Sequence, residues 1–222
     1  MLHGSRGTHQ ELRPLAEAMT EFCSPILLNL LGHGGRDIPD LLTVKGMAGD
    51  VLEQMDTHGI KSTYCFGYSF GGYVALYLAR HFPERIKGVC TLATKVNFDE
   101  QTVSLWTRLS GVQRIRNLQR DIMDQRHPGQ DWDRLVEGLV NLYRRLGTMP
   151  ELSADDFARI TVPSLIISAD KDQLVPWPEA LALAYSIPNG QGFTFAGMAH
   201  PFSLIPPPFL ATVIGKWLAS RQ

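Results

Sequence analysis

Apolar and polar residues alternate along this chain in two patterns that differ in period. Short apolar runs, suited to buried strands, occur at residues 25–31, 60–66, 86–93, 162–169 and 192–195. Stretches with apolar residues at helical spacing occur at 12–19, 44–55, 72–82, 179–185 and 209–220. Because the two kinds of segment follow each other in turn, the sequence predicts an α/β fold with a mostly parallel sheet flanked by helices.

The start of the first helix carries two signals that conflict. Thr8 and Glu11 have the spacing of a capping box, which would begin a helix at this point. Pro14 is awkward inside such a helix, so we expect the true start to lie later in the chain.

The alternation breaks at residues 96–158, where no convincing strand is visible. Helical patterns cover 104–125 and 132–145 within this stretch. We therefore expect one α/β core, formed by residues 1–95 and 159–222, with a helical insertion at 96–158.

Gly67, Ser69 and Gly71 form the pattern Gly-x-Ser-x-Gly at the junction of a predicted strand and a predicted helix. A serine on such a sharp turn is held in a strained backbone conformation that exposes its hydroxyl group. Glycine is needed on both sides because a Cβ there would clash with the adjoining strand or helix. This arrangement, a nucleophile elbow, predicts Ser69 as a nucleophile. The competing interpretation is an ordinary turn serine.

A serine hydroxyl needs a base to remove its proton, and the base needs an acid that orients it. In a strand–elbow–helix architecture these partners are expected on loops after later strands, first the acid and then a histidine. Asp172 follows the strand-like run at 162–169, and His200 follows the run at 192–195. Asp170 competes with Asp172 for the role of the acid, and the Val-Pro pair that follows favours Asp172.

With these three motifs in this order, the chain resembles the α/β-hydrolase superfamily from His3 to its C-terminus. The resemblance implies the α/β-hydrolase fold, with residues 96–158 in the place of the family's helical cap. It also implies a catalytic triad of Ser69, Asp172 and His200 that uses no cofactor and no metal.

An oxyanion hole needs two backbone N–H groups directed at the oxygen on which negative charge develops. One is expected from Phe70, directly after the nucleophile. The resemblance implies that the second comes from Ser5, the residue after His3 and Gly4 in the loop that follows an early strand.

The other histidines have structural interpretations that we favour over catalytic ones. His33 lies between glycines and invites a role as ligand or base, but the family commonly has Gly-His-Gly in this loop as structure. We interpret His3 as structural too. His58, His81 and His127 fall near helix ends or turns, where we expect them to be solvated.

The insertion also contributes aromatic and basic side chains that can face a substrate. Trp106, with Phe98 and Trp132, can line an acyl pocket, although such residues more often only pack a cap against a core. Eight of the fifteen arginines lie in the insertion: Arg108, Arg114, Arg116, Arg120, Arg126, Arg134, Arg144 and Arg145. They can attract an anionic substrate, but we favour a solvated outer face.

The bulk composition argues against several other classes of protein. The chain has 222 residues, of which 44% are hydrophobic, and its 21 basic and 22 acidic side chains leave a net charge of -1. This balance gives no reason to expect a nucleic acid or an anionic membrane as partner, and no apolar run reaches the roughly 20 residues of a membrane span. The three cysteines lack metal-type spacing and no signal peptide is visible, so we expect a cytoplasmic protein.

The start of the chain is at odds with the resemblance, since family members have two or three strands before the His-Gly loop. Only Met1 and Leu2 precede His3. The strands predicted at 25–31 and 60–66 would flank a gap with unpaired backbone groups, which two residues cannot fill. Our hypothesis is that N-terminal strands are missing because the natural protein begins further upstream. The alternative is that another segment or a partner chain completes the sheet.

These observations together predict a serine hydrolase that cleaves a carboxylic ester, or next a thioester, of a small molecule through an acyl-enzyme intermediate. Two alternatives stay open: a carbon–carbon bond hydrolase or lyase that uses the same triad, and a weakly catalytic ligand-binding receptor on the same fold. The expected partner is a small-molecule acyl substrate, with no nucleic acid and no membrane. The sequence leaves homo-oligomerisation open.

Overall fold

A four-stranded parallel sheet forms the centre of the structure, a computed structural model that describes residues 1–221. The strands lie side by side in chain order, β1-β2-β3-β4. They span Thr63–Tyr68 (β1), Ile86–Leu92 (β2), Ser164–Ala169 (β3) and Gly190–Phe195 (β4). The predicted, mostly parallel α/β fold is therefore confirmed.

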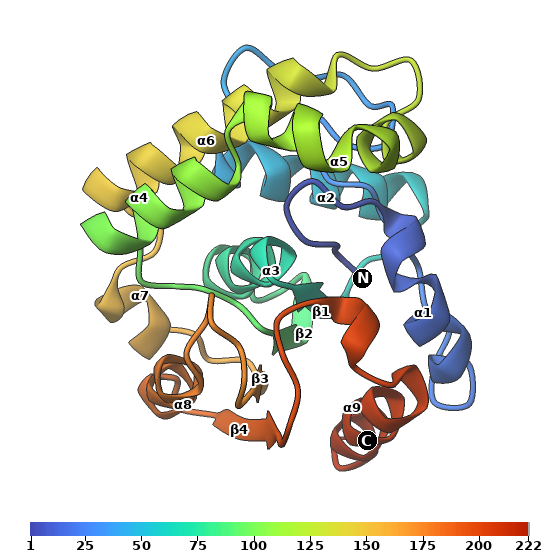
Figure 1. The fold of residues 1–222 in the computed structure, drawn as a ribbon. Helices are drawn as coiled ribbons and strands as arrows, with labels where there is room; N and C mark the ends of the chain where they lie inside the picture. Colours follow the sequence, from blue (N-terminus) through green and yellow to red (C-terminus); the bar gives the residue numbers. More distant parts are fainter. Residues whose placement is uncertain (222) are drawn as a thin grey trace.

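Helices cover both faces of this sheet, which explains why its inner strands are apolar along most of their length (Figure 1). One face packs against α2 (Val44–Thr57), α3 (Phe70–His81) and α8 (Trp177–Ser186). The other face packs against α1 (Arg13–Met19) and α9 (Pro207–Ala219), which also contact each other. Each face thus has its own hydrophobic core.

The segment between β2 and β3 contains helices and no strand in the described chain. These helices are α4 (Glu100–Leu109), α5 (Val112–Arg126), α6 (Trp132–Thr148) and α7 (Ala154–Ala158). The first three contact one another and form a layer above α3 in Figure 1, whereas α7 packs against α3 and α8. We refer to the first three as the α4–α6 layer. Across residues 1–221, no helix is both long and apolar enough to span a lipid bilayer.

The first helix begins later than the capping-box pattern predicts. The Thr8 side chain accepts no capping hydrogen bond, so the predicted capping box is wrong. A 3₁₀ turn covers His9–Leu12, and α1 starts only at Arg13. Pro14 then lies in the first turn of α1, where its missing N–H is not needed. The expected later start is confirmed.

The strand predicted at 25–31 does not form, because it has too little backbone beside it to pair with. Only Leu28 makes a bridge, to Leu2, and Leu2 also bridges to Gly67 at the edge of β1. The Leu2 N–H donates to the Phe66 carbonyl over 2.8 Å, and the Tyr68 N–H donates to the Leu2 carbonyl over 3.0 Å. The start of the chain therefore joins the two segments at one point.

Past this point the two segments stay apart. An apolar cavity of about 170 Å³ lies between them, lined by side chains that include Met1, Ile26 and Tyr64. Leu2 thus bridges the expected gap in the sheet next to the elbow, and the gap stays open near the start of β1. The bridge is what fixes the loop after Leu2 beside Ser69.

Candidate active site

Ser69 stands at the sharp turn between β1 and α3. Its backbone has φ 51° and ψ -118°, a left-handed conformation that L-residues rarely adopt. The Ser69 N–H donates to the Leu92 carbonyl over 2.8 Å, and the Thr94 hydroxyl donates to the Ser69 carbonyl over 3.1 Å. These bonds hold the strained turn in place, as the elbow pattern predicts.

The glycines around Ser69 are required by close backbone contacts. A Cβ on Gly67 would lie within the van der Waals radius of the Gly71 backbone. A Cβ on Gly71 would in turn overlap the carbonyl oxygens of Leu2 and His3. The loop at the start of the chain can therefore approach Ser69 closely only because no side chain stands at Gly71.

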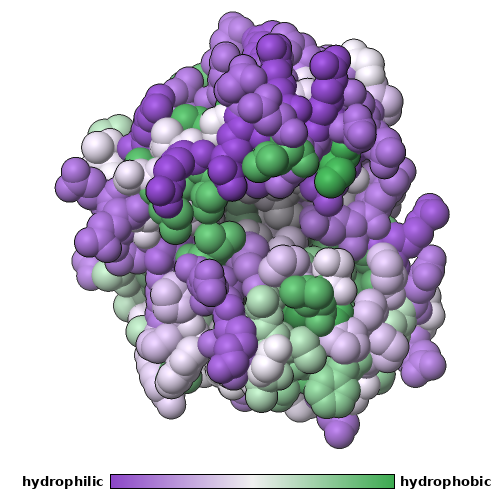
Figure 2. All heavy atoms as spheres, in the orientation of Figure 1, coloured by the Kyte–Doolittle hydropathy of each residue, from purple (hydrophilic) through white to green (hydrophobic). Residues whose placement is uncertain are grey.

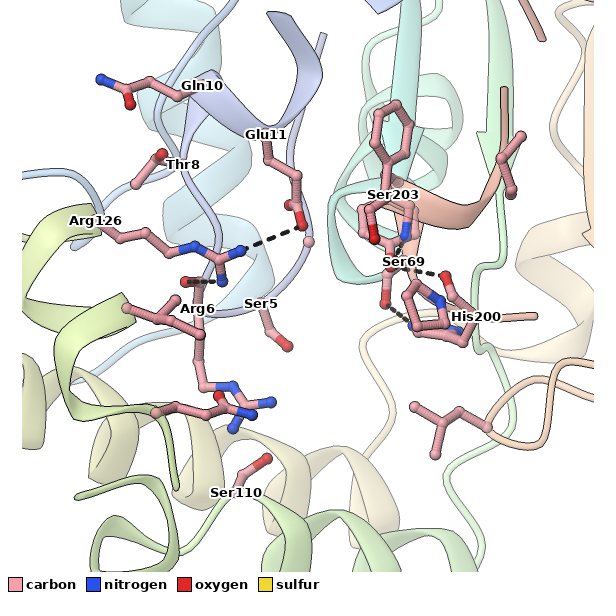
Figure 3. A pocket seen from close by; sticks show the side chains of 18 of the residues that line it. Ser5, Arg6, Thr8, Gln10, Glu11, Ser69, Ser110, Arg126, His200 and Ser203 are labelled. Carbon is pink, nitrogen blue, oxygen red and sulfur yellow. Dashed lines mark hydrogen bonds and ion pairs between the residues drawn. The ribbon is translucent and has the colours of Figure 1, made fainter. Parts of the chain in front are cut away.

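Ser69, His200 and Asp172 come together in a hydrogen-bonded row (Figure 3 shows the first two). The Ser69 Oγ lies 3.1 Å from His200 Nε2, and His200 Nδ1 lies 2.8 Å from Asp172 Oδ2. The Asp172 side chain is fully buried, and its Oδ1 accepts from the N–H groups of Leu174 and Val175 over 2.8 and 2.9 Å. A carboxylate at Nδ1 favours the tautomer with its proton there, which leaves Nε2 free to accept from the serine hydroxyl.

Asp170, the competing acid, lies outside this row. Its nearest charged partner is the Lys171 ammonium at 3.9 Å, and His200 bonds to Asp172 instead.

Tyr68 fixes the loop that carries His200, a contact that the sequence interpretation missed. The Tyr68 hydroxyl donates to the His200 carbonyl over 2.9 Å and accepts from the Phe202 N–H over 3.2 Å. Burial raises the pKa of Tyr68 well above its usual value, so the hydroxyl stays protonated and can donate. The only sequence signal for this role is its place directly before Ser69 in the elbow.

The two predicted oxyanion donors come from different parts of the chain. Phe70 is the first residue of α3, where a backbone N–H has no partner within its own helix. Ser5 lines the same cleft as Ser69, and in the described chain its N–H forms no intramolecular hydrogen bond. Figure 3 shows the Ser5 side chain across the open space from Ser69 and His200.

The sequence model of the family described as alpha/beta hydrolase fold matches residues 1–136, more than half of the chain. The chain belongs to the α/β-hydrolase family. A curated relative is the putative carbamate hydrolase RutD of Pseudomonas savastanoi pv. phaseolicola, 25% identical over 206 residues that cover 82% of this chain and 78% of that protein.

Other similar proteins are an acetyltransferase component and an esterase. The dihydrolipoyllysine-residue acetyltransferase component of the acetoin cleaving system of Cupriavidus necator is 30% identical over 209 residues, 85% of this chain and 54% of that protein. Among solved structures, a thermophilic esterase from Thermogutta terrifontis matches with a TM-score of 0.78 and 20% identity, over 99% of this chain and 88% of that one. The structural likeness supports the α/β-hydrolase fold.

Three buried histidines support the loop of residues 3–8, here called the Ser5 loop, in this α/β-hydrolase chain. His3 Nδ1–H donates to the Gly4 carbonyl over 2.8 Å, and its Nε2 accepts from the Leu30 N–H over 3.1 Å. The ring centroids of His3 and His33 are 5.0 Å apart, and those of His33 and His127 are 5.9 Å apart. Burial lowers the pKa of His3 well below its usual value and that of His33 to about 4, so both rings are neutral at pH 7.

The expectation that His127 is solvated is wrong. Its side chain is buried because the end of α5 folds back over the Ser5 loop. His127 Nδ1 accepts from the Gly34 N–H over 3.0 Å, and Nε2 donates to the Arg6 carbonyl over 3.2 Å. The imidazole therefore ties the α4–α6 layer to the loop beside Ser69.

A cleft of about 880 Å³ opens in front of Ser69 and His200, between the Ser5 loop and the α4–α6 layer. Figure 2 shows this face of the molecule hollowed near its middle. Of the three aromatic candidates, Trp106 lines the cleft, while Phe98 packs against Trp106 and Trp132 donates to Asp124 over 2.7 Å.

The arginines of the insertion divide into two groups. Arg116 and Arg134 pair with Asp133 and Asp40 at the surface, in agreement with the solvated-face interpretation. Arg126 belongs to the second group, since it lines the cleft. Within residues 1–221, no three His, Cys, Asp or Glu side chains are grouped so that they could hold a metal ion.

Proposed function

We propose that this chain is a serine hydrolase that cleaves a carboxylic ester of a small molecule through an acyl-enzyme intermediate. Membership of the α/β-hydrolase family and relatives named hydrolases support hydrolase activity in general. The observation that carries the finer proposal is the row of hydrogen bonds from Ser69 through His200 to the buried carboxylate of Asp172. A strained serine whose hydroxyl faces an oriented imidazole is the arrangement of an activated nucleophile.

In the first half of the reaction, Ser69 Oγ attacks the ester carbonyl while His200 Nε2 takes the serine proton. Asp172 keeps the Nδ1 proton in place and stabilises the imidazolium that forms. The N–H groups of Phe70 and Ser5 donate to the oxyanion of the tetrahedral intermediate. When the intermediate collapses, His200 gives its proton to the departing alcohol.

In the second half, a water molecule replaces the alcohol. His200 takes a proton from this water, which attacks the acyl-enzyme carbonyl, and then returns the proton to Ser69 Oγ as the acid leaves. The same two N–H groups hold the oxyanion a second time. The triad is then back in its starting state.

The size and lining of the cleft support a small-molecule substrate. A volume of about 880 Å³ is in the range of pockets that enclose drug-sized ligands. Apolar side chains such as Trp106 and Ile122 alternate there with polar ones such as Gln10 and Ser110. Thioesters present the same carbonyl chemistry and are the next substrate class that we propose.

Carbamates form a second candidate class, because several relatives are named putative carbamate hydrolases. A carbamate carbonyl can be attacked by Ser69 in the same way, with the carbamoyl group held on the serine in place of an acyl group. The choice between ester and carbamate depends on groups in the cleft rather than on the triad.

The test is hydrolysis of p-nitrophenyl esters of graded chain length, with a p-nitrophenyl carbamate and a β-diketone in the same panel. We expect the wild type to hydrolyse at least one ester, and Ser69→Ala to lower kcat about 10⁴-fold or more. Ser104→Ala, on the exposed side of α4 and outside the cleft, is the matched control and should retain wild-type rates. Cleavage of the diketone alone would support carbon–carbon bond hydrolysis, and full ester hydrolysis by Ser69→Ala would overturn the proposal.

A further inference from the structure

Arg6 occupies a backbone position that normally suits glycine. It lies in a tight turn closed by a hydrogen bond from the Gly7 N–H to the Gly4 carbonyl over 3.0 Å. Its φ is 61°, in the left-handed region that a long side chain adopts only at a cost of about 1 kcal/mol or more. An arginine at such a position, directly after the predicted oxyanion donor Ser5, calls for a reason outside the backbone.

The Arg6 guanidinium lies in the cleft without a partner. Its Nη1 is buried and has no hydrogen-bond acceptor among residues 1–221, and no carboxylate of this part of the chain lies within 4.0 Å of it. Figure 3 shows the guanidinium across the open space from Ser69 and His200. Trp106, which also lines the cleft, has a buried Nε1–H that likewise lacks an acceptor in the described chain.

The ionisable groups around the cleft leave this positive charge uncompensated. Besides Tyr68 and His200, they are Arg6, Arg126 and Glu11. Glu11 Oε1 lies 3.8 Å from Arg126, so this carboxylate is placed against the other guanidinium and not against Arg6. The Asp172 carboxylate is engaged by His200 and two backbone N–H groups. Two guanidinium groups thus face the cleft against at most one nearby carboxylate.

A partly buried guanidinium without a counter-ion is unfavourable, and a carboxylate is the partner that its planar array of donors fits best. We propose that Arg6 binds a carboxylate group of the substrate, so that the preferred esters carry a second, anionic carboxylate besides the bond that is cleaved. Arg126 adds to the positive potential from the other side of the Ser5 loop. This inference rests on the proposed function, since it names the substrate class of the same site.

The first test compares esters with and without the charge. Monomethyl glutarate is paired with its carboxamide, methyl glutaramate, and O-acetylglycolate with O-acetylglycolamide, so that each pair differs only in the negative group. We expect the wild-type kcat/KM to be about 10- to 100-fold higher for the carboxylate in at least one pair. Arg6→Gln should bring this ratio close to one, Arg6→Lys should restore part of it, and Arg120→Gln, an exposed arginine of α5, should leave it unchanged.

A second test separates binding from hydrolysis. Titration calorimetry of Ser69→Ala with intact monomethyl glutarate or methyl glutaramate measures affinity without turnover. Tighter binding of the carboxylate, lost in the Ser69→Ala, Arg6→Gln double variant, supports the inference even where hydrolysis is slow. If neither ester is hydrolysed but the carboxylate binds more tightly, the proposed reaction fails and the anion site stands. If both members of each pair react and bind equally, the anion site fails and the proposed reaction stands.

Stability distinguishes a ligand-binding arginine from a structural one. Arg6→Gly relieves the positive φ and removes the charge, so its melting temperature should equal or exceed that of the wild type. A clear loss of stability in this variant, with an unchanged carboxylate preference, would show that Arg6 only supports the turn and would overturn the inference.

Discussion

Replacement of Asp172 by asparagine tests how the structure orients His200. Asp172 Oδ1 accepts two backbone N–H groups, from Leu174 and Val175, and Oδ2 accepts from His200 Nδ1. In Asp172→Asn the new amide must keep its oxygen toward the two N–H donors, since the opposite orientation would set donor against donor. Its NH₂ group then faces His200 Nδ1. The imidazole is driven to the tautomer with its proton on Nε2, which cannot accept from Ser69.

The expected size of the effect follows from these contacts. Loss of the buried, charge-assisted bond to the imidazolium removes about 2–3 kcal/mol of transition-state stabilisation. The wrong tautomer of His200 adds about 2 kcal/mol, because a buried donor or acceptor must be left unpaired before Nε2 can act as a base. The sum, about 4–5 kcal/mol, corresponds to a decrease in kcat of about 10³- to 10⁴-fold. Stability should change little, because the amide oxygen keeps both backbone bonds.

The assay is steady-state hydrolysis of the best p-nitrophenyl ester, with the melting temperature as a check on folding. Asp170→Asn is the matched control, since this carboxylate lies two residues away and does not bond to His200. We expect it to retain kcat within a few-fold of the wild type. A folded Asp172→Asn enzyme with a kcat within tenfold of the wild type, together with an inactive Asp170→Asn enzyme, would refute the assignment of the acid.

Two further predictions concern the surroundings of the triad. Tyr68→Phe leaves the Phe202 N–H and the His200 carbonyl without their shared partner, so unfolding in denaturant should show a loss of about 1–3 kcal/mol and kcat should fall with it. For His33, folding lowers the pKa from 6.5 to about 4, so its stabilising contribution is complete above about pH 6.5 and is lost progressively as the pH falls toward about 4. Because of His33, the free energy of unfolding measured in denaturant should therefore be about 2 kcal/mol lower at about pH 5 than at about pH 7. His33→Asn should reduce this difference, whereas His58→Asn, at an exposed position, should leave it unchanged.

The sequence predicts those parts of the fold that local pattern determines. The apolar runs that form β2 and β3 are buried on both faces. A short, continuous apolar run of this kind is typical of a buried strand in a parallel sheet. Residues 25–31 are also a strongly apolar run and still form only one bridge, because a strand also needs a neighbour for its backbone groups. Whether a neighbour is present depends on the chain around it and not on the run itself.

The candidate site likewise has one part that short sequence motifs predict and another part that they do not. The residues of the row from Ser69 to Asp172 stand in short motifs with fixed geometry, so their meeting could be predicted. Arg6 and His127 could not be predicted, since their roles depend on how α5 folds back over the Ser5 loop, about 120 residues away in the chain. The one local signal for Arg6 is its place between Gly4 and Gly7 in a turn.

The most direct test of the central claim is to identify the residue that becomes covalently modified. The protein is treated with a fluorophosphonate, which reacts with serines activated by an adjacent base, and its peptides are mapped by mass spectrometry. We predict one adduct per chain, on Ser69, with loss of ester hydrolysis in proportion, and no adduct in Ser69→Ala. Full hydrolysis without an adduct, or an adduct on another residue that abolishes activity, would contradict the assignment of Ser69 as the nucleophile.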